Sequence, residues 1–303
     1  MKPVMKQGGQ RSAFTIVELL TVMSIIVILI GLLVPALNKV KIYAMKVKQN
    51  AQFHSIEAAL ELFNSEFEGY PESGALDPRD QPYPGAMKLC EAMMGWDLLG
   101  FHTNSMFRSD GLGANDQMLY DPTDLSARRG PFLPLESANA YRLEDLYPPD
   151  SPGLGQFNGR NFVLCDVFAK QRHNVKAGMP ILYYKANTAN SLHLRDINGQ
   201  EFVPPNPRDA AGNIYNYWDN QQVLELGKPW VKGGAGSEGK SHRLADYRVF
   251  YQNTRSHKIE TPWRPYMADR FILISAGHDN EYGTADDICN YDWKYTEVDT
   301  QQN

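Results

Sequence analysis

The sequence predicts an α+β fold in which one long N-terminal helix packs on an antiparallel sheet and the head is enlarged and rich in loops. Three observations lead to this prediction. Residues 19–37 form an apolar run without a charged side chain, apolar residues at helical spacing continue to Phe67, and segments with strand character begin only after residue 160. Helical material followed by strands, rather than alternating with them, favours an antiparallel sheet with helices on one side.

The apolar run is long enough to cross a membrane. As a helix, its nineteen residues would span roughly 28 Å, which matches the hydrocarbon thickness of a bilayer. The whole chain has a mean hydropathy of −0.44 and 21% charged residues, so the remainder is expected in water. We therefore expect one membrane anchor on a water-exposed domain, with Pro35 kinking or loosening the helix near its outer end.

Glu18 directly precedes this apolar run. A lone ionisable group at membrane depth is costly, and it is a functional-site hypothesis by default. Two simpler interpretations are a secretory signal cleaved after the run and an uncleaved signal anchor. Neither of them explains why a carboxylate occupies this position.

The residues around Glu18, Phe14-Thr15-Ile16-Val17-Glu18-Leu19-Leu20, resemble the start of a mature type IV pilin-like protein. The resemblance implies that residues 1–13 are a leader, cut between Ala13 and Phe14 by prepilin peptidase, which also methylates the new amine. Ala13 stands where this family usually has Gly. The resemblance further implies that Glu18 pairs in a filament with the Phe14 amine of a neighbouring copy, which would offset the cost of burying either charge.

The long helix is expected over residues 14–69, and its second half is expected to enter the head. Gly69, with Pro71 two residues later, gives a stop signal. An apolar stripe precedes this signal at helical spacing. The stripe consists of Ile56, Ala59, Leu60, Phe63 and Phe67.

Residues 70–303 are expected to form the head. Further helices are predicted over residues 86–99 and 141–146, and long surface loops over residues 187–239. The helix at 86–99 carries a sulfur-rich face of Met87, Cys90, Met93 and Met94, which is more typical of a core than of a cofactor site. Strands are predicted at residues 162–167, 181–185, 247–251 and 271–275.

The net charge and the spacing of the cysteines exclude some classes of partner and of metal site. The net charge is −5, and an acidic body argues against a nucleic-acid partner. Cys90, Cys165 and Cys289 are widely spaced and form no Cys-x-x-Cys motif, so a metal–thiolate site is not expected. We expect the three cysteines to be mainly small buried apolar residues.

Residues 234–241 match the phosphate-loop pattern G-x-x-x-x-G-K-S. The motif requires a buried strand directly before it, whereas residues 227–233 include two lysines and a proline. Glu238 would also bring a negative charge towards the phosphates. We therefore favour a flexible glycine loop, with a membrane-anchored NTPase as the alternative interpretation.

Residues 276–288 follow the last predicted strand and form an acidic loop, with four acids between Asp279 and Asp287 and two glycines. Calcium takes six to eight oxygen ligands, and glycine lets a chain curl around the ion. The spacing does not fit an EF-hand, and a hydrated turn capped by Asp residues is the alternative. His278 is expected to be an exposed loop residue.

The acidic loop also resembles the C-terminal calcium loop of the major pseudopilin of type II secretion systems. This resemblance implies calcium as the cofactor, with Asp279, Asp286 and Asp287 as side-chain ligands and the Ala276 carbonyl as an addition. Glu281 and Thr284 are weaker candidates.

The two resemblances together imply a structural subunit of a type II secretion pseudopilus or a type IV pilus-like filament, and not an enzyme. The expected partners are copies of the chain, other pseudopilins, prepilin peptidase and an inner-membrane assembly platform. The helix would lie in the inner membrane and the head in the periplasm. Alternatives are a minor tip subunit whose large head recruits partners, and an uncleaved, anchored calcium-binding module.

Overall fold

The computed structural model describes residues 15–147, 154–171, 175–194, 212–228, 241–259, 262–292 and 294–298. The chain forms two compact units, Met1–Ala44 and Met45–Asn303. We refer to the second unit as the head. Within the described residues the fold is α+β, with one long N-terminal helix and several small antiparallel sheets.

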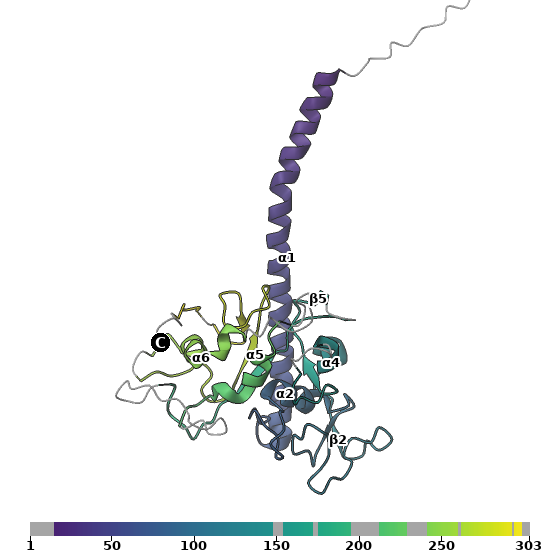
Figure 1. Cartoon of the computed structure of the whole chain (residues 1–303), viewed down its shortest axis with the longest axis vertical. Coiled ribbons are helices and arrows are strands. Elements are labelled where there is room, and N and C mark those ends of the chain that lie inside the picture. The colour runs from purple at the N-terminus through teal and green to yellow at the C-terminus, as the bar shows by residue number, and fades with distance from the viewer. Residues whose placement is uncertain are drawn as a thin grey trace, which may run out of the picture. The chain divides into compact units, whose positions relative to one another are not determined.

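Helix α1 (Ile16–Phe67) has 52 residues and contributes to both units (Figure 1). Over residues 16–40 its apolar side chains are exposed, and none of the residues in its most apolar window is buried. Pro35 lies inside the helix without ending it. The helix is long and apolar enough to span a membrane, so the predicted N-terminal apolar helix is confirmed.

In the head, α1 buries one face. Its buried residues recur every three or four positions, as expected for one side of a helix. They are Gln49, Gln52, Phe53, Ile56, Ala59, Leu60 and Phe63. Helix α2 (Gly85–Met94) lies beside this part of α1 and shares a hydrophobic cluster with it (Figure 1).

A three-stranded antiparallel sheet packs against the same hydrophobic cluster. Strand β8 (Phe271–Ser275) lies between β7 (Leu182–Lys185) and β9 (Ile288–Cys289), with Leu182 opposite Ile274 and Ser275 opposite Ile288. Every residue of β8 is buried. Because side chains alternate between the two faces of a strand, β8 contacts the α1 cluster with Phe271 and Leu273 and a second cluster with Ile272 and Ile274.

Polar side chains fix α1 to the sheet. Asn290 donates from Nδ2 to Glu57 on α1 at 3.0 Å, and its Oδ1 accepts from the backbone N–H of Leu273 at 2.9 Å. Arg270, directly before β8, forms an ion pair with Glu61. These contacts set the axial position of the helix against the sheet in the head.

Three two-stranded antiparallel sheets complete the strands of the described residues. They pair β1 (Phe101–His102) with β2 (Arg128–Arg129), β3 (Ala140–Arg142) with β4 (Phe162–Leu164), and β5 (Lys170–Gln171) with β6 (Lys176–Ala177). Within the described residues, the remaining helical elements are α3 (Leu135–Ala138), α4 (Leu143–Leu146), η1 (Tyr217–Asn220), α5 (Gln221–Glu225), η3 (Arg243–Ala245) and α6 (Tyr247–Thr254).

One predicted strand is wrong, because residues 247–251 lie in helix α6. The apolar residues there fit either period. Asp246 caps the helix by accepting from the backbone N–H of Arg248 at 2.8 Å, and Val249 and Phe250 pack in the second cluster. The cap and the position of the neighbours select the helix.

Several boundaries also differ from the predictions. Helix α2 stops at Met94, before Gly95 with a φ of 87°, rather than continuing to residue 99. The predicted helix at 141–146 is divided between β3 and α4. The predicted surface loop at 187–239 includes η1 and α5, whose Val223 and Leu224 are buried.

The expectation of a sulfur-rich core is confirmed. Met87, Cys90, Met93 and Met94 on α2 are all buried. Cys165 is buried as well, whereas Cys289 is half-buried, and all three cysteines are free thiols.

Candidate functional site

Glu18 lies in the first turn of α1 and is exposed. Its Oε2 accepts from the backbone N–H of Thr15 at 3.0 Å and from the Thr15 hydroxyl at 2.8 Å. The Thr15 Oγ1 in turn accepts from the backbone N–H of Glu18 at 3.2 Å. This reciprocal pair is a capping box, which satisfies backbone groups that a helix start leaves without partners.

The capping box is a local role for Glu18 that our sequence analysis missed. The signal was available, because Thr-x-x-Glu directly before an apolar run is the usual pattern of such a cap. Ala13 and Phe14, the two residues of the predicted cleavage site, lie outside the described residues.

The acidic loop joins β8 to β9, which pair with each other. Gly277 and Gly283 have φ values of 64° and 90°. A Cβ at Gly277 would lie 2.2 Å from the carbonyl oxygen of Asp286, and one at Gly283 would lie 2.7 Å from the backbone nitrogen of Leu244. Both positions therefore require glycine, and the two ends of the loop are drawn together at Gly277.

Three oxygen acceptors converge on the hydroxyl of Thr284. Its Oγ1 lies 3.0 Å from Asp279 Oδ2, 2.8 Å from Asp286 Oδ1 and 3.2 Å from the carbonyl oxygen of Glu281. A hydroxyl has one proton to donate, so these contacts include more acceptors than donors. Burial and the neighbouring Asp286 raise the pKa of Asp279, whereas hydrogen bonds from Asp279 and Thr284 hold the pKa of Asp286 below its usual value although burial opposes this.

This oxygen set fits a hard cation, since calcium accepts carboxylate, carbonyl and hydroxyl oxygens. Asp279, Asp286, Thr284 and the Glu281 carbonyl would hold it. Only two carboxylates meet here, and within the described part of the chain no group of three or more His, Cys, Asp or Glu side chains is arranged to hold a metal. Further ligands would have to be backbone oxygens or water.

The other predicted ligands are placed differently. Asp287 is buried and its Oδ2 accepts from the backbone N–H of Gly283 at 2.7 Å, while burial raises the pKa of Asp287 well above its usual range. Ala276 is buried at the start of the loop. His278 is exposed, as predicted.

The carboxylate of Glu281 has basic partners outside the acidic loop. Lys228 Nζ lies 2.5 Å from its Oε2, and His242 Nδ1 lies 3.7 Å from its Oε1. Burial alone would raise the pKa of Glu281, but the hydrogen bonds and charges of His242 and Lys228 lower it to about 2. The ion pair therefore fixes the acidic loop to the segment that follows α5.

The phosphate-loop match is mostly outside the described residues, which include only Ser241 of the motif. Asp166, which follows β4, is buried and accepts from the hydroxyl of Ser275 at 2.8 Å and from the backbone N–H of Phe168 and of Met179, each at 3.1 Å. This carboxylate connects β4 to β8.

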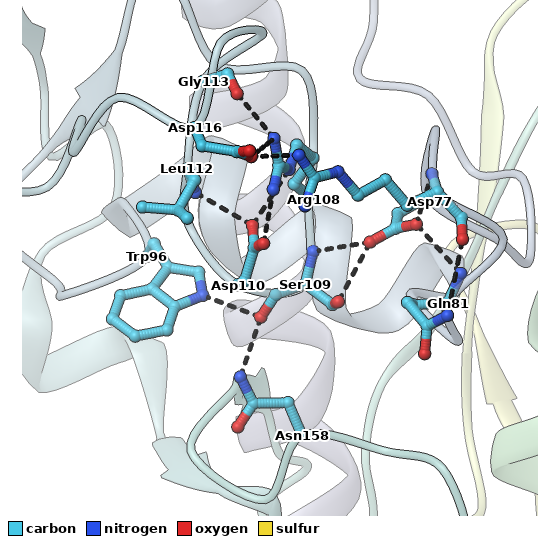
Figure 2. Close-up of polar contacts among 11 residues, drawn as sticks. Asp77, Gln81, Trp96, Arg108, Ser109, Asp110, Leu112, Gly113, Asp116 and Asn158 are labelled. Atoms are coloured by element: carbon cyan, nitrogen blue, oxygen red, sulfur yellow. Dashed lines mark hydrogen bonds and ion pairs between the residues drawn. The ribbon is translucent and has the colours of Figure 1, made fainter.

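A second polar network joins the loops before and after α2, and our sequence analysis missed it because the loop of Asp77 and the loop of Arg108 are separated by about thirty residues in the chain. Figure 2 shows Arg108 between Asp110 and Asp116, with Asp77 bridging two loops. Arg108 Nη2 lies 2.5 Å from Asp110 Oδ2 and Nη1 lies 3.0 Å from Asp116 Oδ1. Asp77 Oδ1 accepts from the backbone N–H of Gln81 at 2.9 Å, and Oδ2 accepts from that of Ser109 at 3.1 Å (Figure 2).

Comparisons of the chain with family models, curated proteins and solved structures found no match.

Proposed function

We propose that the chain is a structural subunit of a pilin-like filament, most similar to the pseudopilins of type II secretion systems. In this proposal the head faces the periplasm, and α1 holds the precursor in the inner membrane before assembly. The observation that carries the proposal is an apolar helix that has Glu18 in its first turn and buries none of its most apolar window.

The exposed apolar surface of α1 needs a non-aqueous environment. Side chains such as Ile28, which is 61% exposed, would be unfavourable in water in such a continuous array. Lipid would cover them in the precursor, and the helices of neighbouring copies would cover them in a filament. One helix can thus serve both as an anchor and as an assembly element.

Glu18 would have two roles, one within its own helix and one between copies of the chain. The capping box with Thr15 engages Oε2, so the carboxylate can hold the helix start and still carry a negative charge. In a filament that charge would pair with the Phe14 amine of a neighbouring copy, and removal of residues 1–13 by prepilin peptidase would create the amine. The pairing would fix the axial register between copies.

Calcium would stabilise the acidic loop of the head. The carboxylates of Asp279 and Asp286 both contact the hydroxyl of Thr284, and the positive charge of the ion would reduce the repulsion between them. Because this loop joins β8 to β9, the ion would stabilise the edge of the three-stranded sheet. The ion would then have a structural role.

Two substitutions at Glu18 test the proposal. Glu18→Gln keeps a side chain that can complete the capping box but removes the charge, whereas Glu18→Ala removes both. We expect both variants to insert into the membrane and both to be lost from filaments or cross-linked oligomers. Normal assembly of Glu18→Gln would contradict the charge-pairing role.

Sequencing of the N-terminus of protein recovered from its native membrane gives an independent test. We expect the mature chain to begin at a methylated Phe14. A chain that still begins at Met1 would favour the uncleaved, anchored module instead.

A further inference from the structure

A cleft in the head contains a buried carboxylate that the proposed function does not use. One cavity, of about 250 Å³, is lined by residues of the loop 74–80 together with Asn216 and Asp219. A neighbouring cavity, of about 460 Å³, lies towards Lys185 and Thr188, and Gly74, Asn216 and Asp219 belong to the walls of both. Asp219 therefore sits where the two cavities adjoin.

Asp219 is firmly positioned. It lies in η1, and the next residue, Asn220, fixes this turn by accepting from the backbone N–H of Ala86 at 2.8 Å and donating to the carbonyl of Tyr183 at 2.7 Å. Ser73 donates its hydroxyl proton to Asp219 Oδ2. The Ser73 hydroxyl in turn accepts from the backbone N–H of Lys185 at 3.0 Å.

The loop 74–80, which forms another wall of the cleft, is also held in place by hydrogen bonds. Lys88 on α2 donates from Nζ to the carbonyl oxygens of Gly74 and Leu76, at 2.7 and 2.9 Å. Asp77 ties the same loop to Ser109 through the network of Figure 2. These contacts fix the position of the loop 74–80, which forms this wall of the cleft.

Asp219 is only 6% exposed, yet its Oδ1 has no hydrogen-bonding partner within the described residues. The charge of Lys88 acts on Asp219, but no ion pair joins the two within the described residues, so the cost of burying this carboxylate is only partly offset. The other acids of the two walls are engaged or at the rim. Asp77 uses both of its oxygens, Glu72 pairs with Lys185 at 2.6 Å, and Asp80 is exposed.

We propose that this cleft binds a protonated amine or a guanidinium group, with Asp219 as its counter-ion. The two cavities are lined by four acids and by the base Lys185, and Lys88 contacts the backbone of the loop 74–80, so acids exceed bases by four to two, which favours a cation. A divalent metal ion would need several carboxylates turned towards it, whereas one open carboxylate oxygen suits an N–H donor. The inference does not depend on filament assembly.

The charge state of Asp219 makes binding dependent on pH. Burial raises the pKa of Asp219 to about 7, although the Ser73 hydrogen bond and the Lys88 charge partly oppose the shift. The charges that act on it are those of Lys88 on α2 and Glu72, and Lys185 on β7 lines the second cavity. The buried hydroxyls of Tyr183, Tyr184 and Tyr251 also lie within electrostatic reach of Asp219. Affinity for a cation should therefore fall roughly 30-fold between pH 8 and pH 5.5, as the carboxylate becomes protonated.

The test is calorimetric titration of the full chain in detergent micelles with arginine amide at pH 8 and low salt. We expect saturable binding of arginine amide and none of citrulline amide, which has a similar shape but no charge. Asp219→Asn should weaken binding at least tenfold, because Asn can still accept from Ser73 but has no charge. The control Asp80→Asn, at the exposed rim, should change binding less than twofold.

A second probe distinguishes the source of the cation. Tighter binding of an Arg-containing tripeptide blocked at both ends would indicate a protein side chain, and equal or weaker binding would indicate a free small amine. The proposal is overturned if neither probe binds, if citrulline amide binds equally, or if Asp219→Asn binds like the parent. Should that variant fail to fold, an affinity of the parent that does not change from pH 8 to pH 5.5 would overturn it as well.

Discussion

The two parts of α1 differ in where their apolar side chains go. Over residues 19–37 the helix is apolar on all sides and exposed, and within the first unit no other element of the described chain covers it. In the head the same helix is amphipathic: five buried apolar residues share a cluster with α2 and the three-stranded sheet, and the buried Gln49 and Gln52 bond to the backbone of Val167, Ser137 and Cys165. The head part is stabilised by contacts within the head, whereas the apolar side chains of the N-terminal part stay exposed, and in our proposal lipid or neighbouring copies cover them.

The largest expected effect tests this difference directly. Ile56 is fully buried, so Ile56→Ala should reduce the free energy of unfolding of the head by roughly 2–5 kcal/mol. The same substitution at the exposed Ile28 should change it by less than about 0.5 kcal/mol. Denaturant unfolding in detergent measures both values, and equal effects would contradict the distinction between the two parts.

Calcium is expected to act on the head alone. At a calcium concentration 100 times its Kd, the head should gain about 2.7 kcal/mol over the protein in chelator. Asp286→Asn should remove this gain, and the exposed Asp292→Asn should retain it. Identical melting of the parent with calcium and with chelator would contradict the proposed ion site.

Substitution of glycine by alanine should have opposite signs in the two parts. Gly277→Ala should destabilise the head by roughly 2 kcal/mol, because its φ is positive and a Cβ would meet Asp286. Gly31 lies in α1 with open space around it, so Gly31→Ala should favour the helix by up to about 1 kcal/mol. Thermal unfolding by circular dichroism measures the first, and the helicity of the full chain in micelles measures the second.

The smallest expected effect comes from the ion pair of Glu281. The pKa of this side chain is lowered to about 2 in the fold, from a usual value near 4.5. Its contribution to stability is therefore complete above pH 4.5 and is lost as the pH falls towards 2. Glu281→Gln should flatten the pH dependence of the melting temperature in that window, and an unchanged profile would contradict the role of the pair.

Local pattern was sufficient for the elements whose period is unambiguous. The length of α1, the strand β8 and the sulfur-rich face of α2 were predicted from the sequence, and the structure confirms them. Helix α6 was predicted as a strand because a short apolar segment fits both periods, and its cap and neighbours decide between them.

For the candidate sites, too, local sequence patterns predicted some features and the tertiary structure decided the others. The sequence by itself determined that a carboxylate lies in the first turn of an apolar helix and that acids gather after the last predicted strand, since both patterns lie within a few consecutive residues. Only the tertiary structure decided that Asp279 and Asp286 share Thr284 while Asp287 turns to Gly283, and that Asp219 faces a cleft opposite Lys88. Those contacts join segments far apart in the chain or depend on the exact path of a loop, and the energy of packing, rather than local preference, sets both.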